Sequence, residues 1–515
     1  MNYKIAVALL TCLLSCGDKK KDSAKTRDDA AAGPTVAPIS TPPIGVDSIK
    51  RMNFPYGDGM REWEKATPAL KAKSWNALKT HADATLAKDP NHLDAHRMLA
   101  TALVQNGEHA AAVDHLAAAL AGDYFKYGPA LANDEDLKPF FATPHGTAIK
   151  EVAEKIRGEY VKRAATGLLV IGRRSSFKWP KEGVPWATSR GELYAFDRET
   201  RRYFRLTHTD HQVAGFVRAP SGAEVAVFGF DKIDRPKGDD ATPLMTRGWV
   251  QVMDTKDWKL VGTKVPLGGG REVHLGYGAG DQLLIGTAPA NGRWGIGEIT
   301  LSSLDKATGK VTKVKSQAPV PRIIFSLEEG RGVRALDDIK ATWAGDPPTA
   351  PDLATSGGAS IHVPESGAAS QSSVSLSPDK ARIAFATAVD PCSKDASPSL
   401  YVADAKTGAL KHLLTSKSRF VTRWLDATTL AYEDGDGAVR IWDAASGREA
   451  IKLENKVGIA LDVLSLAPAP LCKGAPPTVD VGSGSGDEPP PLPPEEGSAG
   501  SAIGSGDGGP VTKPN

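Results

Sequence analysis

The second half of the chain repeats one pattern of apolar and polar residues. A short alternating strand ends in an aspartate, and a turn closed by Ser-Gly or Thr-Gly leads into a second strand. The clearest copy spans residues 439–447, with the sequence VRIWDAASG. Alternation places one face of each strand on a core, and the aspartate can accept hydrogen bonds from turn amides. Because one hairpin cannot bury its apolar face alone, the pattern predicts stacked sheets.

The spacing of the strand-end aspartates predicts how many sheets the region contains. Their successive separations are 57, 51, 99 and 39 residues. A four-stranded propeller blade takes roughly 40–50 residues. The separation of 99 residues is close to two periods and therefore predicts one degenerate blade within it. The five aspartates are Asp197, Asp254, Asp305, Asp404 and Asp443, of which Asp197 and Asp254 end looser copies of the pattern.

Each blade is also expected to open with a hairpin that contains a tight turn. A fifth hairpin, Ile323 to Leu336, fills the long gap. A sixth is split, because Gly167 to Ile171 begins the region without a partner and Val457 to Leu466 follows the last blade. Pairing these two strands would close a ring and remove its free edges, so we expect six blades, with seven as the main alternative. The other four hairpins are Phe216–Phe230, His274–Gly286, Val374–Phe385 and Phe420–Tyr432.

Two segments of these repeats resemble known propeller families. Ile441-Trp442-Asp443 resembles the end of a WD-repeat blade, and Leu376-Ser377-Pro378-Asp379 resembles the propeller repeats of the TolB type. The resemblance covers about Gly167 to Leu466, although no copy carries the full Gly-His and Trp-Asp pair of a WD repeat. It implies an all-β propeller over residues 163–472, a fold that serves as a binding scaffold in these families.

Residues 58–162 change from strand to helix periodicity. Asp94 to Asp123 alternates large and small apolar residues as two closely packed helices require, with Gly107 at the turn. The segment resembles a tetratricopeptide repeat, except that His96 stands at the signature Trp position. A second copy precedes it from Trp63 to Pro90, and a degenerate pair follows. The resemblance implies two to three helix pairs with a concave groove for a peptide or protein, and a generic helical-hairpin domain is the alternative.

The N-terminus is a targeting segment followed by a polar tether. Residues 1–15 contain an apolar run of about ten residues, which is too short to span a membrane. Leu13-Leu14-Ser15-Cys16 resembles a bacterial lipoprotein signal, which implies that Cys16 becomes the acylated first residue. Gly17 in the second mature position favours the outer membrane over the inner one. Residues 16–57 carry too little apolar surface to fold and are expected to be disordered. An ordinary signal peptide or an uncleaved anchor is the alternative.

Two cysteines, Cys392 and Cys472, remain beyond the signal and the lipid site. In an exported chain they favour one disulfide, which would close a loop of about 80 residues and contribute roughly 4 kcal/mol in the chain-entropy model. The predicted strand order places the two residues near opposite faces of the propeller, so two free thiols are the alternative. Residues 473–515 are rich in Gly, Ser and Pro and are expected to form a disordered tail.

The sequence contains no recognisable catalytic, cofactor or metal site. Residues 208–211 (HTDH) lie between predicted blades, and residues 433–437 (EDGDG) lack part of the carboxylate set of a calcium loop. The formal net charge of +2 predicts no affinity for nucleic acid. We therefore expect a non-enzymatic, lipid-anchored scaffold that binds a protein or peptide partner in the cell envelope. The alternative is a propeller-based enzyme or small-molecule sensor that uses the central channel, near His274, Arg322, Ser372 and Arg419.

Overall fold

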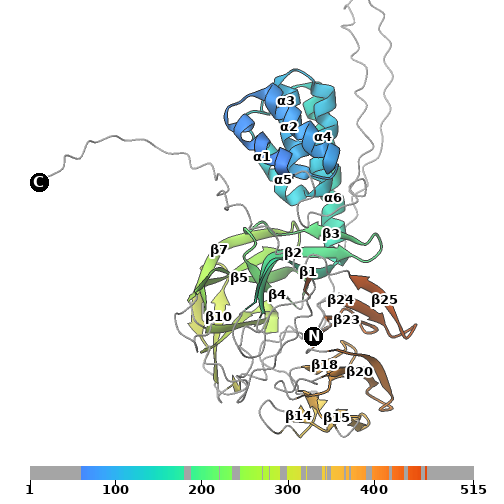
Figure 1. Cartoon of the computed structure of the whole chain (residues 1–515). Helices are drawn as coiled ribbons and strands as arrows, with labels where there is room; N and C mark the ends of the chain where they lie inside the picture. The colour runs from blue at the N-terminus through green and yellow to red at the C-terminus, as the bar shows by residue number, and fades with distance from the viewer. Residues whose placement is uncertain are drawn as a thin grey trace, which may run out of the picture.

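The computed structural model places a helical region before a many-stranded region of small antiparallel sheets (Figure 1). The predicted segments 1–15 and 473–515, the tether, Cys16, Cys392 and Cys472 all lie outside the described residues. Within those residues, no helix is both long and apolar enough to cross a membrane. The structure describes residues 60–178, 187–219, 221–234, 244–268, 271–277, 279–289, 298–314, 320–321, 339–342, 344, 349–364, 367–370, 373–389, 397–416, 420–433, 439–453 and 459–460.

The helical region packs helices that follow one another along the chain, as the periodicity predicts. Gly107 takes a positive φ of 81° at the turn between the third and fourth helices, a conformation that glycine adopts without steric cost. Leu99, Leu103 and Leu116 are buried between these two helices. The helices are α1 (Met60–Lys71), α2 (Trp75–Lys88), α3 (Leu93–Gln105), α4 (His109–Gly122), α5 (Tyr124–Ala132) and α6 (Pro144–Thr166), with the short 3-10 helix η2 (Phe140–Ala142) before α6.

The last helix, α6, connects the two regions (Figure 1). Its N-terminus is capped by Thr143, whose hydroxyl accepts a hydrogen bond from the amide of Gly146 at 3.1 Å. The helix runs for 23 residues to Thr166 and so extends past residue 162, the expected end of the helical domain. It continues because Ala164 is still fully buried in this last turn.

The first sheet joins two sets of four antiparallel strands through a single pair, Gly191 and Val213. The first set runs in the order β26-β1-β2-β3, and the second in the order β4-β5-β6-β7. The strands are β1 (Leu168–Lys178), β2 (Ala187–Asp197), β3 (Arg202–Arg205), β4 (Val213–Arg218), β5 (Glu224–Asp234), β6 (Leu244–Asp254), β7 (Lys259–Gly268) and β26 (Ile459–Ala460).

Three of the following sheets repeat the same antiparallel order of four consecutive strands, in β8–β11, β18–β21 and β22–β25. The predicted opening hairpins β4–β5, β8–β9, β18–β19 and β22–β23 are all paired. Between β12 and β18 only short pieces are described, and the expected hairpin Ile323 to Leu336 lies outside the described residues. These strands are β8 (Arg271–Tyr277), β9 (Leu283–Pro289), β10 (Glu298–Asp305), β11 (Lys310–Lys313), β12 (Val320–Pro321), β13 (Ile339–Lys340), β14 (Thr349–Ala350), β15 (Asp352–Thr355), β16 (Ile361–His362), β17 (Ala369–Ser370), β18 (Ser375–Leu376), β19 (Arg382–Ala386), β20 (Ser399–Asp404), β21 (Leu410–Thr415), β22 (Val421–Trp424), β23 (Thr429–Glu433), β24 (Val439–Asp443) and β25 (Arg448–Leu453).

The five strand-end aspartates occupy the predicted positions, at the ends of β2, β6, β10, β20 and β24. Each carboxylate accepts a hydrogen bond from the backbone amide two residues further on, at 2.7–3.1 Å. Hydrogen bonds from the turn hold the pKa of Asp305, Asp404 and Asp443 below its ordinary value. The turn chemistry that the sequence predicted is therefore confirmed.

The two ends of the β region meet in one sheet, as predicted. β26 pairs antiparallel with β1, and Ile171 lies opposite Ala460 while Gly172 lies opposite Ile459. This pairing covers an edge of β1 that would otherwise expose unpaired backbone groups. The region is thus a propeller-like series of small sheets whose last described strand joins the first sheet (Figure 1).

Candidate functional site

The helical region is fixed to the first sheet by both apolar and ionic contacts. The rings of Tyr160 on α6 and Phe204 on β3 pack edge to face with centroids 4.8 Å apart, and both side chains are fully buried. Arg163 of α6 donates to the carboxylate of Asp197 at 2.5 Å. This carboxylate also stabilises the turn after β2, so one aspartate serves both the repeat and the junction.

The loop of residues 208–211 is part of the same junction, and His208 and His211 contact carboxylates of the protein there. His208 Nε2 lies 3.0 Å from the carboxylate of Asp123, which is completely buried at the end of α4. His211 contributes its backbone amide to Glu192 at 2.9 Å. Within the described ranges, no group of three or more His, Cys, Asp or Glu side chains could hold a metal ion.

Glu192 on β2 is a fully buried carboxylate held by the residues around it. It accepts hydrogen bonds from the hydroxyls of Thr207 and Thr209 at 2.5 and 3.0 Å, and from Arg205 at 3.1 Å. The amides of Thr209 and His211 complete the set at 2.8 and 2.9 Å. A buried charge is costly unless it is paired and hydrogen-bonded. These five hydrogen bonds therefore stabilise the loop of residues 207–211, and they occupy both oxygens of the Glu192 carboxylate.

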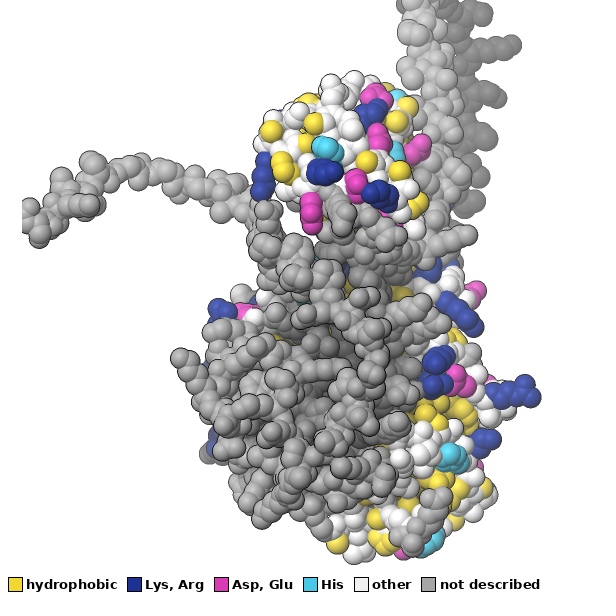
Figure 2. Space-filling model, in the orientation of Figure 1, with side chains coloured by type: hydrophobic (Ala, Val, Ile, Leu, Met, Phe, Trp, Pro, Cys, Tyr) yellow, Lys and Arg dark blue, Asp and Glu magenta, His cyan; other side chains and the backbone are white. Residues whose placement is uncertain are grey.

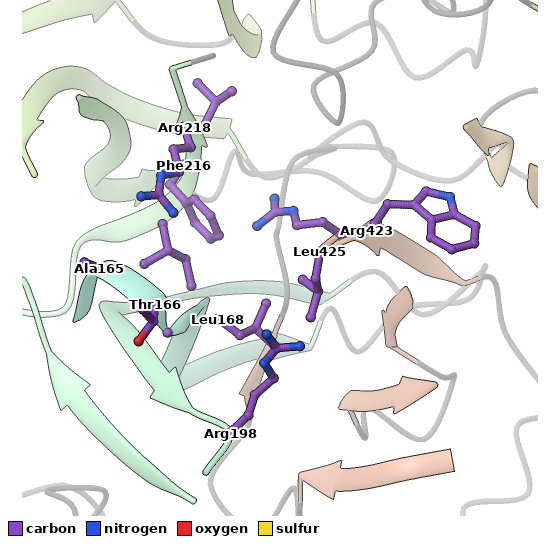
Figure 3. Close-up of a pocket in the computed structure, with 12 residues that line it drawn as sticks. Ala165, Thr166, Leu168, Arg198, Phe216, Arg218, Arg423 and Leu425 are labelled. Atoms are coloured by element: carbon purple, nitrogen blue, oxygen red, sulfur yellow. The ribbon is translucent and has the colours of Figure 1, made fainter. Parts of the chain in front are cut away.

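A pocket of about 260 Å³ lies where the end of α6 meets β1, β4 and β22 (Figure 3). Its apolar lining includes Leu168 at the start of β1, Phe216 on β4 and Leu425 just after β22. Three cationic side chains surround this surface: Arg198 from the turn after β2, Arg218 at the end of β4 and Arg423 on β22.

The three guanidinium groups are held differently. Arg423 lies over the ring of Phe216, with the guanidinium carbon 4.4 Å from the ring centroid. Arg198 lies 3.9 Å from the carboxylate of Asp426. Arg218 is exposed at the end of β4 and has no ion-pair partner in the part of the chain that the structure describes. Partial burial nevertheless lowers the pKa of Arg218. A guanidinium that lacks a counter-ion beside an apolar surface can bind a carboxylate through paired hydrogen bonds.

Sequence reasoning did not find these arginines. Arg198 and Arg218 lie more than 200 residues before Arg423, and no local motif links them. Of the expected channel residues, His274 lies on β8, whereas Arg322, Ser372 and Arg419 are outside the described residues. The arginines come together only because β26 and the last sheet return to the first sheet.

Comparison with known proteins assigns no family to the chain. No protein-family model matches it, and no curated protein matches it. Among solved structures, TolB from Acinetobacter baumannii is 12% identical, with 62% of this chain and 73% of that chain covered and a TM-score of 0.34. The tricorn protease is 13% identical, with 56% of this chain but 26% of that chain covered and a TM-score of 0.32. An uncharacterised protein from Listeria monocytogenes EGD-e is 9% identical, with 54% and 82% covered and a TM-score of 0.26. The chain thus spans about a quarter of the tricorn protease chain.

Proposed function

We propose that this chain is a non-enzymatic, lipid-anchored scaffold that binds a protein partner in the bacterial cell envelope. In this proposal Cys16 carries the lipid, and the outer membrane is the favoured location. The helices form a tetratricopeptide-like array, and the sheets form a six-bladed propeller. The observation that carries the proposal is the basic pocket formed by Arg198, Arg218 and Arg423 where these two regions meet.

The basic pocket suits a group smaller than a drug-sized ligand, such as a side chain. Pockets for drug-sized ligands have volumes of roughly 300–1,000 Å³, whereas this pocket has about 260 Å³. Its arginines suit a carboxylate, and Leu168, Phe216 and Leu425 suit an adjacent apolar residue. We therefore propose that the partner presents an acidic residue next to apolar ones in an extended segment.

The charge distribution also supports a protein partner. Figure 2 shows acidic, basic and apolar side chains interspersed over the visible face of the helical region. A nucleic-acid-binding surface would instead concentrate Lys and Arg on one face. The buried carboxylates of Asp123 and Glu192 are both occupied by structural hydrogen bonds, which favours a binding role over acid–base catalysis.

The test uses the Cys16→Ser chain lacking residues 1–15 and a fluorescein-labelled acidic peptide, acetyl-Leu-Glu-Leu-Asp-amide, with binding followed by fluorescence anisotropy. We expect Arg218→Gln to weaken binding about tenfold, because a hydrogen bond to a charged group contributes about 1.5 kcal/mol. The matched control is Arg448→Gln, an exposed arginine on the outermost strand of the last sheet. Equal affinities for the original chain, Arg218→Gln and Arg448→Gln would contradict the proposed site.

A pull-down from solubilised envelope with the acylated chain then identifies the partner, and a protein lost with Arg218→Gln but retained with Arg448→Gln supports the scaffold function.

A further inference from the structure

The helical region contains a pair of histidines that is independent of the basic pocket. His96 lies on α3 and His115 lies on α4, and both side chains are partly exposed. Their Nδ1 atoms are 2.9 Å apart, and their ring centroids are 5.2 Å apart. His96 occupies the position at which the tetratricopeptide resemblance would place Trp, so an imidazole pair replaces an aromatic packing residue here.

The orientation of His96 leaves a lone pair directed at His115. Its Nε2 atom lies 2.8 Å from the carbonyl oxygen of Pro90. A carbonyl can only accept, so Nε2 must carry the hydrogen, and Nδ1 of the neutral ring is then a bare acceptor. Metal-binding histidines are commonly held in the same way, with the second ring nitrogen donating to a carbonyl.

The hydrogen bond between the two rings fixes which nitrogen carries the proton. Because His96 Nδ1 is the acceptor, His115 Nδ1–H donates to it in the observed state. Replacing this hydrogen bond by a cation requires His115 to lose the proton at Nδ1 and gain one at Nε2 from solvent, so no net proton is released.

We infer that His96 and His115 form a two-imidazole site for Cu²⁺. In the neutral tautomers that ligation requires, both Nδ1 lone pairs face the space between α3 and α4. Imidazole nitrogens bind Cu²⁺ more tightly than the other first-row divalent ions, so Cu²⁺ is the cation that two such ligands suit best. Water occupies the remaining positions, because no third His, Cys, Asp or Glu joins the pair in the described part of the chain.

The experiment titrates Cu²⁺ into the Cys16→Ser chain lacking residues 1–15 and records the electron paramagnetic resonance spectrum. We expect one Cu²⁺ per chain with hyperfine coupling to two imidazole nitrogens. His96→Gln and His115→Gln are each expected to reduce the Cu²⁺ affinity at least tenfold, with unchanged circular dichroism. The matched control is His81→Gln on α2, which should bind as the original chain does.

Two results would overturn the inference. One is equal Cu²⁺ affinity in the original chain and in the double variant His96→Gln/His115→Gln, which would place the ion elsewhere. The other is a spectrum without imidazole nitrogen coupling at one equivalent of Cu²⁺. A parallel titration with Zn²⁺ should give weaker binding, and tighter Zn²⁺ binding would contradict the assignment of the site to Cu²⁺. Because the peptide-binding test involves neither histidine, failure of this inference leaves the proposed function unaffected.

Discussion

Replacing Glu192 by glutamine should destabilise the β region strongly, although the two side chains have nearly the same shape. The substituted side chain would keep only one acceptor oxygen. Its amide nitrogen would replace either the oxygen that accepts from the hydroxyls of Thr207 and Thr209 or the oxygen that accepts from Arg205 and the amides of Thr209 and His211. Arg205, which is 14% exposed at its side chain, would also lose its carboxylate. Breaking a buried ion pair by removing one partner costs about 3–5 kcal/mol, and we expect Glu192→Gln to lower the free energy of unfolding by about this amount.

Urea denaturation provides the assay, followed by both far-ultraviolet circular dichroism and tryptophan fluorescence because the chain has two regions. The control is Glu449→Gln, which removes the carboxylate from another Arg–Glu pair, Arg440–Glu449, at 2.7 Å. That carboxylate side chain is 37% exposed, so the control should cost under about 1 kcal/mol. If Glu192→Gln costs no more than Glu449→Gln, the buried hydrogen-bond network does not stabilise this loop and the reasoning is wrong.

Two further predictions concern the junction and the closure of the β region. Burial alone would raise the pKa of Asp123, but His208 and the nearby basic side chains hold it below its ordinary value. The ionised Asp123 therefore stabilises the folded chain above the unfolded pKa of about 3.9. This contribution to the free energy of unfolding is lost as pH falls through the folded value. Urea midpoints measured from pH 6 to pH 3 should therefore decrease less in Asp123→Asn than in the original chain, and parallel curves would contradict this assignment. A chain ending at residue 456 loses β26 and exposes the edge of β1. Light scattering should then detect more self-association than in the full chain, because an unpaired strand edge can pair with another copy. A monomeric truncated chain would show that β26 is not needed to protect this edge.

The junction explains why both regions belong to one structural unit in the described residues. The long helix α6 leads directly into β1, and its Tyr160 and Arg163 pack on the following strands. The basic pocket lies at the end of this helix, next to the strands that join the first and last sheets. A segment bound in the pocket would therefore contact both regions. Its binding would depend on the closure that β26 provides.

Local chemistry accounts for what the sequence alone determined. The aspartate at each strand end predicted the ends of β2, β6, β10, β20 and β24, because its hydrogen bonds form within a few residues. A Gly closes three of the five turns, at Gly309, Gly408 and Gly447. The periodicity of residues 58–162 likewise predicted paired helices with Gly107 at a turn. Even the pairing of the last strand with the first followed from counting hairpins, since an unpaired edge is unfavourable.

Only the tertiary structure decided which side chains meet across long separations. His208 belonged to a possible metal loop in the sequence, but it pairs with Asp123 because α4 and the loop after β3 pack together. His96 faces His115 because α3 and α4 are antiparallel neighbours at one register. Arg218 and Arg423 share a pocket because the two ends of the β region meet. Periodicity predicts which face of an element is buried, but the contacts of polar side chains depend on how those elements are placed in three dimensions.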